Sequence, residues 1–401
     1  MKKRVGVIGA GPAGIMASIV AARAGWQVIL FDSNPGVGRK LLVTGGGRCN
    51  ITNARVHESV YHTGDKSFVR TALSDFGHQD LVSYLEQLCI PLYATDDGWF
   101  YPISNSASNV VDILDAVLDE SGVKKIINTK IARILREPKG FRLFDSEKEF
   151  FVDRLIVASG GKAYPSLGSS GELFDILSGL GHRILPVLPA LAPIRADMSA
   201  IHTLQGVRLD VTASLVKKGN VLGEATGNMI FTSWGVNGPA VMDISHLVNL
   251  NQSDGMLLKI NFLSSQEELL RKMISRYRTG GFPVKALLES VLPQKICVYS
   301  LRRSKIAENE MIGNLSENQL NQLLENLKNV SVKVKGTRDF QFSQVSTGGV
   351  DVRQVDPATM ESQIVRGLYL AGEVLDVVGP CGGYNLQWAF SSGAIAGRLL
   401  P

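Results

Sequence analysis

The sequence predicts an α/β fold in which one domain is split along the chain and a β-rich domain and a small helical domain are inserted into it. Three observations lead to this prediction. A β-branched strand, a glycine-rich turn and a helix open the chain, and another strand ending in glycine lies at 367–373. Between them the hydrophobic period is that of short strands over 195–262 and that of helices over 264–327. The first and last segments are therefore expected to belong to one discontinuous domain.

The N-terminal segment has the pattern of a Rossmann-like unit. The strand at 4–8 runs into GAGPAG at 9–14, a helix follows, and the strand at 27–31 leads into Asp32. In this motif the first glycine permits the tight turn, the second lets a pyrophosphate approach the main chain, and the third lets helix and strand pack closely. The acidic residue can accept hydrogen bonds from ribose hydroxyls. The motif predicts a dinucleotide but does not choose between NAD and FAD.

A second glycine-rich stretch, GRKLLVTGGGRCNITN at 38–53, replaces a third regular βα unit. Its glycines at 45–47 leave consecutive N–H groups free to hold an anion or an extended cofactor. Arg39, Lys40 and Arg48 bring positive charge to the same segment. The stretch would suit a pyrophosphate or an isoalloxazine ring.

Four stretches together resemble the YhiN/BaiN-like flavoproteins, also called the aminoacetone oxidase family. They are the stretch at 38–53, LIVASGGKAYPSLGSSG at 155–171, FTSWGVNGPAVM at 231–242 and GLYLAGEVLDVVGPCGGYNLQWAFSSG at 367–393. The resemblance spans essentially the whole chain and implies that the split domain is an FAD-binding domain, with FAD at the first motif. The family usually carries Thr where this chain has Ser159, and Thr-His where it has Ser233 and Trp234.

The motifs and the resemblance together give a set of expected cofactor-binding residues. Ser159 and the two glycines after it end a buried-looking strand, and Glu373 resembles the acidic residue that contacts the ribityl chain in flavoproteins. The resemblance also implies that a strand from Lys130 to Ile134 approaches the adenine. The full expected set is Gly9, Ala10, Gly11, Pro12, Ala13, Gly14, Asp32, Ser33, Arg39, Lys40, Thr44, Gly45, Gly46, Arg48, Cys49, Asn50, Ile131, Ser159, Gly160, Gly161, Tyr164, Gly372, Glu373, Gly383, Tyr384, Asn385 and Leu386.

The stretch GPCGGYN at 379–385 is expected at the flavin face. A helix starting near Tyr384 or Asn385 would place its N-terminus at the flavin pyrimidine edge, by analogy with flavoprotein motifs, and would favour the anionic reduced ring. Cys381 and Tyr384 are the candidate catalytic residues, as proton donors to a substrate. The alternative for each is packing, because a free cysteine usually behaves as a small hydrophobic residue.

The domain boundaries follow from the changes of period. We expect the FAD-binding domain at 1–190 and 344–401, the β-rich substrate domain at 191–263 and 328–343, and the helical insertion at 264–327. Three prolines in 185–194 indicate an extended connection where the second domain begins. Helices are expected at 80–88, 110–121, 265–277, 283–292 and 316–327, and strands near 126–134, 141–144, 150–158 and 330–340.

Composition excludes several other classes. The 401 residues carry a formal net charge of +5, which permits an anionic partner but is too small to indicate a nucleic-acid-binding protein by itself. The four cysteines are scattered, so neither a disulfide framework nor a metal site is predicted, and reduced thiols in a cytoplasmic protein are expected. The apolar N-terminus superficially resembles a signal peptide, but its glycines and proline have the spacing of the nucleotide motif. No other segment has the length of uninterrupted apolar residues that a membrane span needs.

The sequence therefore predicts an FAD-dependent oxidoreductase without choosing its substrate. The resemblance offers oxidation of a small amine with oxygen, reduction of an enone-type C=C bond, or reduction of uridine in ribosomal RNA to dihydrouridine. The basic residues in SLRRSK at 300–305, with Lys333, Lys335 and Arg338, allow an RNA partner, although a solvated basic face is the commoner explanation. No second strand-associated G-x-G-x-x-G is present, so a transient NAD(P)H donor would have to meet the flavin directly. A flavin-binding sensor without turnover is the non-enzymatic alternative, and the oligomeric state is left open.

Overall fold

The computed structural model describes residues 3–399, which divide into two compact units. The first, which we call the sheet unit, comprises residues 3–188 and 344–399, and the second, the barrel unit, comprises residues 189–343. The split of the first unit is the discontinuity expected from the sequence. The finer division, with 264–327 as a domain of its own, stays a prediction.

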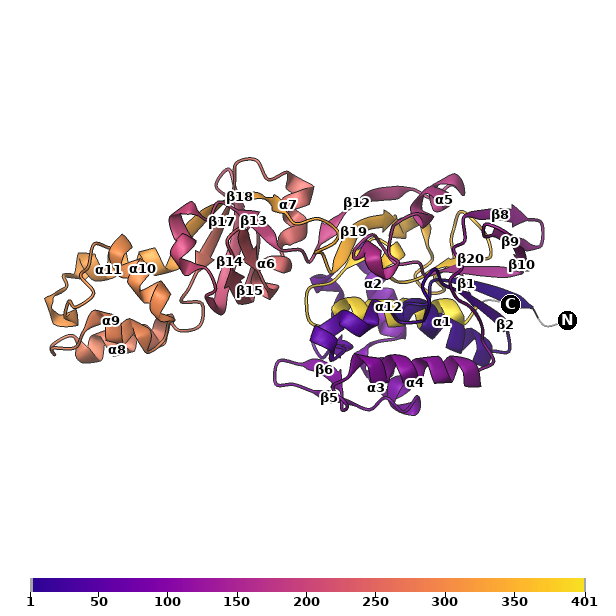
Figure 1. Ribbon diagram of the computed structural model, residues 1–401, viewed down its shortest axis with the longest axis horizontal. Coiled ribbons are helices and arrows are strands. Elements are labelled where there is room, and N and C mark those ends of the chain that lie inside the picture. Colours follow the sequence, from indigo (N-terminus) through magenta and orange to yellow (C-terminus); the bar gives the residue numbers. More distant parts are fainter. Residues whose placement is uncertain (1–2, 400–401) are drawn as a thin grey trace. The chain divides into compact units, whose positions relative to one another are not determined.

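The sheet unit is built on a five-stranded parallel sheet (Figure 1). The order across this sheet is β20 (Leu368–Leu370), β11 (Arg154–Val157), β1 (Arg4–Ile8), β2 (Gln27–Phe31) and β7 (Lys124–Ile126). Four of the five residues of β1 are buried, as expected for a central parallel strand that is covered on both faces. Strand β20 comes from the far end of the sequence, so the last segment completes the sheet that the first segment begins.

One face of the parallel sheet is covered by a three-stranded antiparallel sheet of β8 (Arg133–Glu137), β9 (Gly140–Phe144) and β10 (Glu149–Val152). The missing side chain of Gly6 in β1 leaves room for Leu143 and Val152. The expected strand from Lys130 to Ile134 is wrong in its first half, because β8 begins only at Arg133. Asn128 has a positive φ of 54°, which turns the chain before the strand can start.

The helices α1 (Pro12–Arg23) and α12 (Tyr384–Gly397) pack closely against each other in the sheet unit (Figure 1). Their contact is made by small residues: a Cβ on Gly393 would overlap the carbonyl of Ala13, and one on Gly397 would overlap the carbonyl of Ala17. Twelve of the fourteen residues of α12 are buried. The glycines therefore allow an almost fully buried helix to lie directly on α1.

The remaining elements of the sheet unit are short. Three small sheets join β3 (Thr52–Asn53), β6 (Trp99–Pro102) and β5 (Leu92–Ala94), then β4 (His62–Thr63) and β21 (Val377–Val378), then β12 (Ile184–Ala190) and β19 (Val345–Val350). Four further helices are α2 (Lys66–Asp75), α3 (His78–Gln87), α4 (Ala107–Glu120) and α5 (Leu173–Gly179). Helices α3 and α4 confirm two expected helices, whereas α2 and the β3–β6–β5 sheet were not expected.

The β-rich part of the barrel unit is a closed barrel in the order β13 (Ile194–Ala196), β16 (Gly235–Asn237), β15 (Asn220–Phe231), β14 (Arg208–Lys217), β17 (Met256–Asn261) and β18 (Val330–Thr337). Strand β18 alternates strictly, with Val330, Val332 and Val334 buried and the residues between them exposed. This alternation places the valines in the barrel core and the polar residues on its outer surface. Helices α6 (Pro239–Met242) and α7 (Ser245–Asn251) follow β16.

Four helices complete the barrel unit: α8 (Glu267–Tyr277), α9 (Val284–Glu289), α10 (Gln294–Arg303) and α11 (Glu317–Lys328). Helix α11 begins with a capping box in which the Ser316 side chain accepts from the Gln319 N–H. Three of these helices were expected, whereas α10 was not. Leu270, Leu287 and Leu320 of the helices belong to the same hydrophobic cluster as Leu258 in the barrel, so helices and barrel share one core.

Candidate functional site

The first glycine turn joins β1 to α1, and its three glycines have different surroundings. A Cβ on Gly9 would overlap the carbonyl of Ala158, and one on Gly14 would overlap the carbonyl of Gly9. A Cβ on Gly11 would meet no heavy atom within 4 Å. Gly9 and Gly14 are thus required for close packing, whereas Gly11 leaves the main chain open at the N-terminus of α1. A pyrophosphate fits this opening and would lie on the positive end of the helix dipole.

Asp32 fixes the same turn from the end of β2. The main-chain N–H of Ala10 donates to Asp32 Oδ2 over 2.6 Å, and the N–H of Asn34 donates to Oδ1 over 2.8 Å. A carboxylate has about four lone-pair positions, so it can still accept from a ribose hydroxyl. The N–H of Thr129 donates to the carbonyl of Asp32 over 2.8 Å, which brings the segment before β8, with the buried Ile131, to this end of the sheet.

The stretch at 38–53 forms a 3-10 turn over Leu41–Gly47 that is interrupted at Gly45 and Gly46, whose φ angles are 57° and 67°. A Cβ on Gly46 or Gly47 would meet no heavy atom within 4 Å. Consecutive glycines therefore leave main chain uncovered, which fits the expected cradle for part of an extended cofactor.

Several side chains of the stretch at 38–53 contact other residues of the protein. Burial raises the pKa of the Cys49 thiol to about 12, despite a hydrogen bond with Thr44, so Cys49 is a buried neutral thiol. The Arg48 guanidinium lies 4.5 Å from the centroid of the Tyr101 ring and donates to its hydroxyl over 3.3 Å. Arg48 thus contacts an aromatic residue that the sequence analysis did not single out, while Arg39 is exposed.

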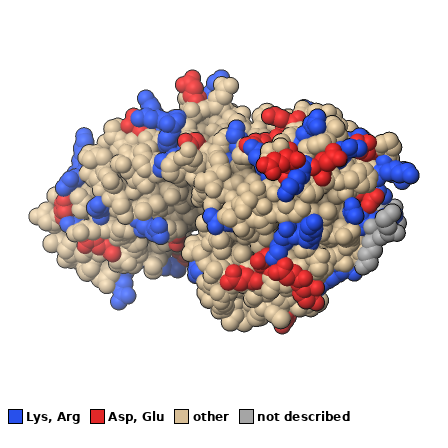
Figure 2. Space-filling view, turned by 45° about the vertical axis from the view of Figure 1, so that its right-hand side comes forward, with Lys and Arg blue, Asp and Glu red and all other residues tan. Residues whose placement is uncertain are grey.

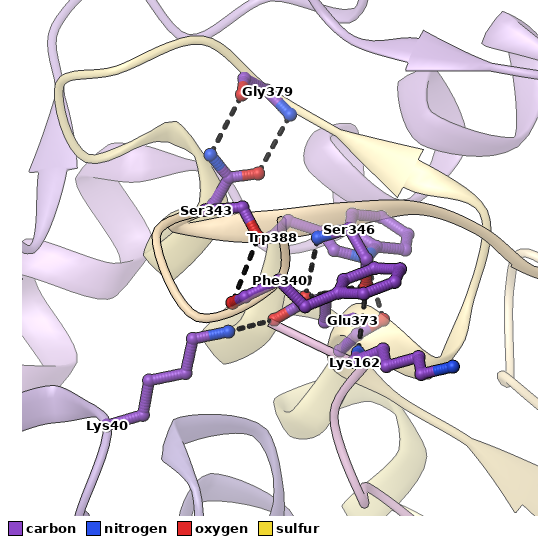
Figure 3. Close-up of polar contacts among 10 residues, drawn as sticks. Lys40, Lys162, Phe340, Ser343, Ser346, Glu373, Gly379 and Trp388 are labelled. Carbon is purple, nitrogen blue, oxygen red and sulfur yellow. Dashed lines mark hydrogen bonds and ion pairs between the residues drawn. The ribbon is translucent and has the colours of Figure 1, made fainter. Parts of the chain in front are cut away.

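Glu373 joins three distant segments of the sheet unit (Figure 3). Its Oε2 accepts from Lys40 Nζ over 2.6 Å, and its Oε1 accepts from the N–H and hydroxyl of Ser346 over 2.9 and 3.1 Å. The Ser346 hydroxyl also accepts from the N–H of Lys162 over 3.0 Å. A Cβ on Gly161 would overlap the Ser346 hydroxyl and crowd the Glu373 carboxylate. Gly161 is thus a packing glycine, and the ends of β11 and β20 meet around one carboxylate.

Gly160 and Tyr164, which lie on either side of Gly161 in the sequence, have positive φ angles of 77° and 55°. The Gly160 Cα faces the hydroxyl of Ser169, so this turn lies close to the segment that follows it. The main chain between β11 and α5 therefore takes a compact path in which the buried Ala158 separates the end of β11 from Ser159.

The stretch GPCGGYN leads into the N-terminus of α12, close to Thr52 and Asn53 of β3. Asn53 Nδ2 donates to the carbonyl of Gly382 over 3.0 Å, and a Cβ on Gly383 would overlap the carbonyl of Thr52. The Gly382 Cα lies against the ring of Trp99. The two most distinctive stretches of the sequence therefore meet at this helix start, and Asn53 and Trp99 are candidate-site residues that sequence reasoning missed.

The turn before α12 is closed by Asn385. Its Oδ1 accepts from the N–H of Gly379 and its Nδ2 donates to the carbonyl of Gly379, both over 2.8 Å, as dashed lines at Gly379 show in Figure 3. These bonds hold the turn itself. The partly buried Leu386 packs into the hydrophobic core of the sheet unit.

The two candidate proton donors differ in exposure. Tyr384 is buried, its ring meets that of Tyr61 edge to face with centroids 6.2 Å apart, and its carbonyl accepts from the Tyr61 hydroxyl over 2.9 Å. Burial raises the pKa of Tyr61. Cys381 is half-buried, at the Gly382 turn. The packing explanation therefore suits Tyr384 better than Cys381.

The stretch at 231–242 lies in the barrel unit. Trp234 is half-buried between β15 and β16, and the guanidinium carbon of Arg338 lies 4.9 Å from the centroid of its ring. Among residues 3–399, no group of three or more His, Cys, Asp or Glu side chains is placed to hold a metal ion, and no helix is long and apolar enough to cross a membrane.

Comparisons with known proteins agree with these features. A family model described as the HI0933-like protein Rossmann domain matches residues 3–399. A 3-dehydro-bile acid delta(4,6)-reductase from Clostridium scindens is 34% identical over 98% of each chain. A ribosomal RNA dihydrouridine synthase from Haemophilus influenzae is 31% identical over 96% of this chain and 95% of its own, and one from Escherichia coli is 30% identical over the same shares. Among solved structures, 3-ketosteroid delta1-dehydrogenase from Sterolibacterium denitrificans has the same fold, with a TM-score of 0.53 and 11% identity over 98% of each chain.

Proposed function

This chain belongs to the HI0933-like family and is an FAD-dependent oxidoreductase, and on that premise we propose that it reduces a carbon–carbon double bond conjugated to a carbonyl group. The observation that carries the proposal is that the names of its full-length relatives describe one kind of reaction. A 3-dehydro-bile acid delta(4,6)-reductase acts on double bonds conjugated to a ring ketone, and dihydrouridine is uridine with its ring double bond, conjugated to a carbonyl, saturated. Both reactions add a hydride and a proton to one kind of bond.

We propose that the glycine turns of the sheet unit hold the FAD. The open main chain at Gly11 would bind the pyrophosphate, Asp32 the adenosine ribose and the uncovered glycines at 46–47 a more distal part of the cofactor. Bound FAD supplies hydride-transfer chemistry. The N-terminus of α12 would contribute its helix dipole, which favours negative charge at the flavin pyrimidine edge.

The Glu373 network supports the ribityl role that we propose for this residue. Lys40 and Ser346 already fix both carboxylate oxygens, so the carboxylate would be positioned before the cofactor binds. A carboxylate held on two sides loses little conformational freedom when it accepts a further bond.

A proton must reach the substrate carbon that does not receive the hydride. Cys381 is our first candidate donor, because its thiol is half-buried beside the Gly382 turn. Tyr384 is the second, although it is buried against Tyr61. A thiol or phenol placed for general acid catalysis typically contributes about 10²–10⁴-fold to the rate.

We propose NAD(P)H as the reductant, binding transiently at the flavin, since the sequence has no second dinucleotide motif of the strand-turn-helix type. We further propose a cytoplasmic location, which is favoured by four cysteines that form no disulfide bond.

The proposal is tested by separating the two half-reactions. The flavin is reduced anaerobically and mixed with a 3-oxo-Δ4 steroid, a uridine-containing oligoribonucleotide or buffer, and recovery of the oxidised flavin spectrum is followed. We expect an unsaturated carbonyl compound to reoxidise the flavin without oxygen. If instead a small amine reduces the oxidised flavin, oxygen alone reoxidises it, and neither unsaturated compound reacts, amine oxidation replaces this proposal.

A second candidate narrows the substrate to uridine in ribosomal RNA, and the distribution of charge favours it. Residues 189–343 contain 18 Lys and Arg against 13 Asp and Glu, which accounts for the whole net charge of +5, whereas the rest of the chain has 24 of each sign. The barrel unit is therefore the cationic part of a protein whose sheet unit is neutral. Mass spectrometry of ribosomal RNA from a deletion strain tests this candidate, because loss of one dihydrouridine is expected and an unchanged RNA contradicts it.

A further inference from the structure

The outer surface of the barrel has a set of cations on three neighbouring strands. Strand β18 pairs with β13 on one side and with β17 on the other. Because alternate residues of β18 point into the core, its two lysines point outward, and the exposed basic residues of the adjacent strands share that surface. We call this set the cationic face: Arg195, Lys259, Lys333 and Lys335.

The cationic face differs from the helical side of the same unit in how its charges are used. On the helices, basic residues form ion pairs, for example Arg271 with Glu267, Lys285 with Glu308 and Arg278 with Glu317. Among residues 3–399, none of the four cations of the face has a carboxylate oxygen within 4.0 Å. These side chains are therefore available to an external anion.

The carboxylate of Asp197 adjoins the cationic face. Its pKa is lowered, chiefly by a hydrogen bond from the Ser199 side chain, then by that residue's N–H and by the charges of Lys335 and Lys333. A second carboxylate, that of Glu224, accepts from Ser214, which pairs with Lys259. The four cations outnumber these two carboxylates, so the face is cationic.

A stack of planar groups lies beside the face. The guanidinium carbon of Arg338, just after β18, is 3.2 Å from the ring centroid of Phe342 and 4.9 Å from that of Trp234. The N–H of Ala196 in β13 donates to the carbonyl of Trp234 over 3.2 Å, so this aromatic stack adjoins the strand that carries Arg195. Phe342 is 39% exposed, a large share for a phenylalanine, and its ring can be reached by a ligand.

We propose that this part of the barrel unit binds single-stranded RNA, with phosphates on the cationic face and a base stacked on Phe342 beside Arg338. Proteins that bind single-stranded nucleic acids combine unpaired cations with an exposed aromatic ring. The cations bind the phosphates, and the ring is a flat surface on which an unpaired base can stack. A double helix would offer its phosphates but no free base face. The inference rests on the RNA candidate proposed above and adds the surface that would bind the RNA outside the reacting uridine.

The test measures binding of a labelled oligouridine by fluorescence anisotropy over a series of salt concentrations. The double variant Lys333→Gln/Lys335→Gln should bind more weakly, and the slope of log affinity against log salt should become less steep by about 1.4, since each single-strand phosphate contact contributes about 0.7. The matched control Lys139→Gln/Lys148→Gln removes two exposed lysines of the sheet unit and should bind as the wild type does.

The variant Phe342→Ala should lower the affinity by about 5- to 150-fold, the range measured for loss of one stacked base, without changing the salt slope. Reduction of a small unsaturated ketone should be unaffected in all these variants, so a failure of the reductase proposal would be seen separately. Wild-type binding by both barrel variants would overturn the inference, and so would equal affinity for the same sequence in a duplex.

Discussion

The two units of this protein present two kinds of candidate functional surface. In the sheet unit the candidate site is mainly exposed main chain, at Gly11 and at the glycines 46–47, held in place by packing glycines such as Gly14 and Gly161. In the barrel unit the candidate surface consists of long side chains on regular strands. A main-chain site leaves a local sequence signature, because only glycine provides it. A side-chain surface becomes visible only when strand register brings distant residues together.

The distribution of charge follows the same contrast. Acidic and basic side chains are interspersed on the face of the sheet unit seen in Figure 2, in keeping with its balanced composition. Both signs are needed there for structure, as in the pair of Lys40 with Glu373. In the barrel unit the surplus is positive, and among the described residues the four cations of the cationic face form no ion pair. The first unit is thus balanced in charge, whereas the second carries the positive surplus that we propose binds RNA.

The largest expected effect comes from a packing glycine. Gly14→Val would push a side chain into the carbonyl of Gly9, and neither main-chain segment can move without breaking the β1–α1 turn. We expect the cost to exceed the ~1–3 kcal/mol of ordinary overpacking and the folded sheet unit to be lost. Circular dichroism during thermal unfolding measures this.

The control for that variant is Gly179→Ala, at an exposed position where a Cβ meets no heavy atom within 4 Å. It should unfold at or slightly above the wild-type temperature. If the two variants behaved alike, the distinction between packing and open glycines would be wrong.

The next largest effect is expected when a side chain is removed from the candidate FAD site, which otherwise consists of main chain. Cys381→Ala should retain FAD and slow reoxidation of the flavin by substrate by about 10²–10⁴-fold if the thiol donates the proton. Tyr384→Phe serves as the comparison, because the phenol alone is lost and the ring remains on Tyr61. Stopped-flow reduction and reoxidation measure both steps. Rates within about threefold of wild type in both variants would leave neither residue as the donor.

A smaller effect tests whether the helical segment 264–327 is a domain of its own. Leu287 of α9 is fully buried in the cluster that also contains barrel residues. If barrel and helices share one core, Leu287→Ala should destabilise both by about 2–5 kcal/mol, while flavin stays bound to the sheet unit. Denaturant unfolding followed by fluorescence of Trp234 in the barrel measures this. An unchanged barrel transition would instead support the separate helical domain expected from the sequence.

The smallest effect is a difference in pH dependence between the units. Burial raises the pKa of Asp376 in the sheet unit, where its Oδ1 accepts from Gly348 N–H over 3.0 Å. Between about pH 3.9, the usual aspartate pKa, and this raised pKa, the folded state binds more protons than the unfolded state, so stability falls as pH rises. Asp376→Asn should abolish this fall.

The barrel unit should respond with the opposite sign. The pKa values of Glu267 and Glu308 are lowered, chiefly by hydrogen bonds from Arg271 and Lys285 respectively. Their contribution is present above the unfolded pKa and is lost only as pH falls through the folded pKa. Unfolding of the Asp376→Asn variant from pH 3 to 7 measures both parts, and a wild-type profile with no difference from the variant would contradict the assignment to Asp376.

The sequence was informative where function depends on the main chain. The strand at 4–8, its glycine turn, the helix after it and the start of α12 at Tyr384 are local patterns, and the structure has them at those positions. The partners of those patterns could not be predicted. Ser346 reaches Glu373, and Asn53 reaches Gly382, only because the parallel sheet and its return segment bring distant positions together.

The misses have local causes as well. Helix α10 was not predicted, because its polar and basic residues obscure the helical period of its apolar residues. The strand predicted from Lys130 begins later because Asn128 has a positive φ. A single residue with a positive φ cannot be recognised reliably from one sequence. Barrel closure depends on the pairing of β13 with β18, which lie more than 130 residues apart in the chain.

The central claim, that open glycine main chain in the sheet unit holds FAD, is tested most directly by measuring the flavin released from purified wild type and Gly11→Val. A Cβ at Gly11 meets no protein atom, so this variant should fold and unfold like the cofactor-free protein, and its new side chain should occupy the pyrophosphate space. We expect about one FAD per wild-type chain and almost none in the folded variant. Full FAD occupancy in Gly11→Val, or FMN in the wild type, would contradict the claim.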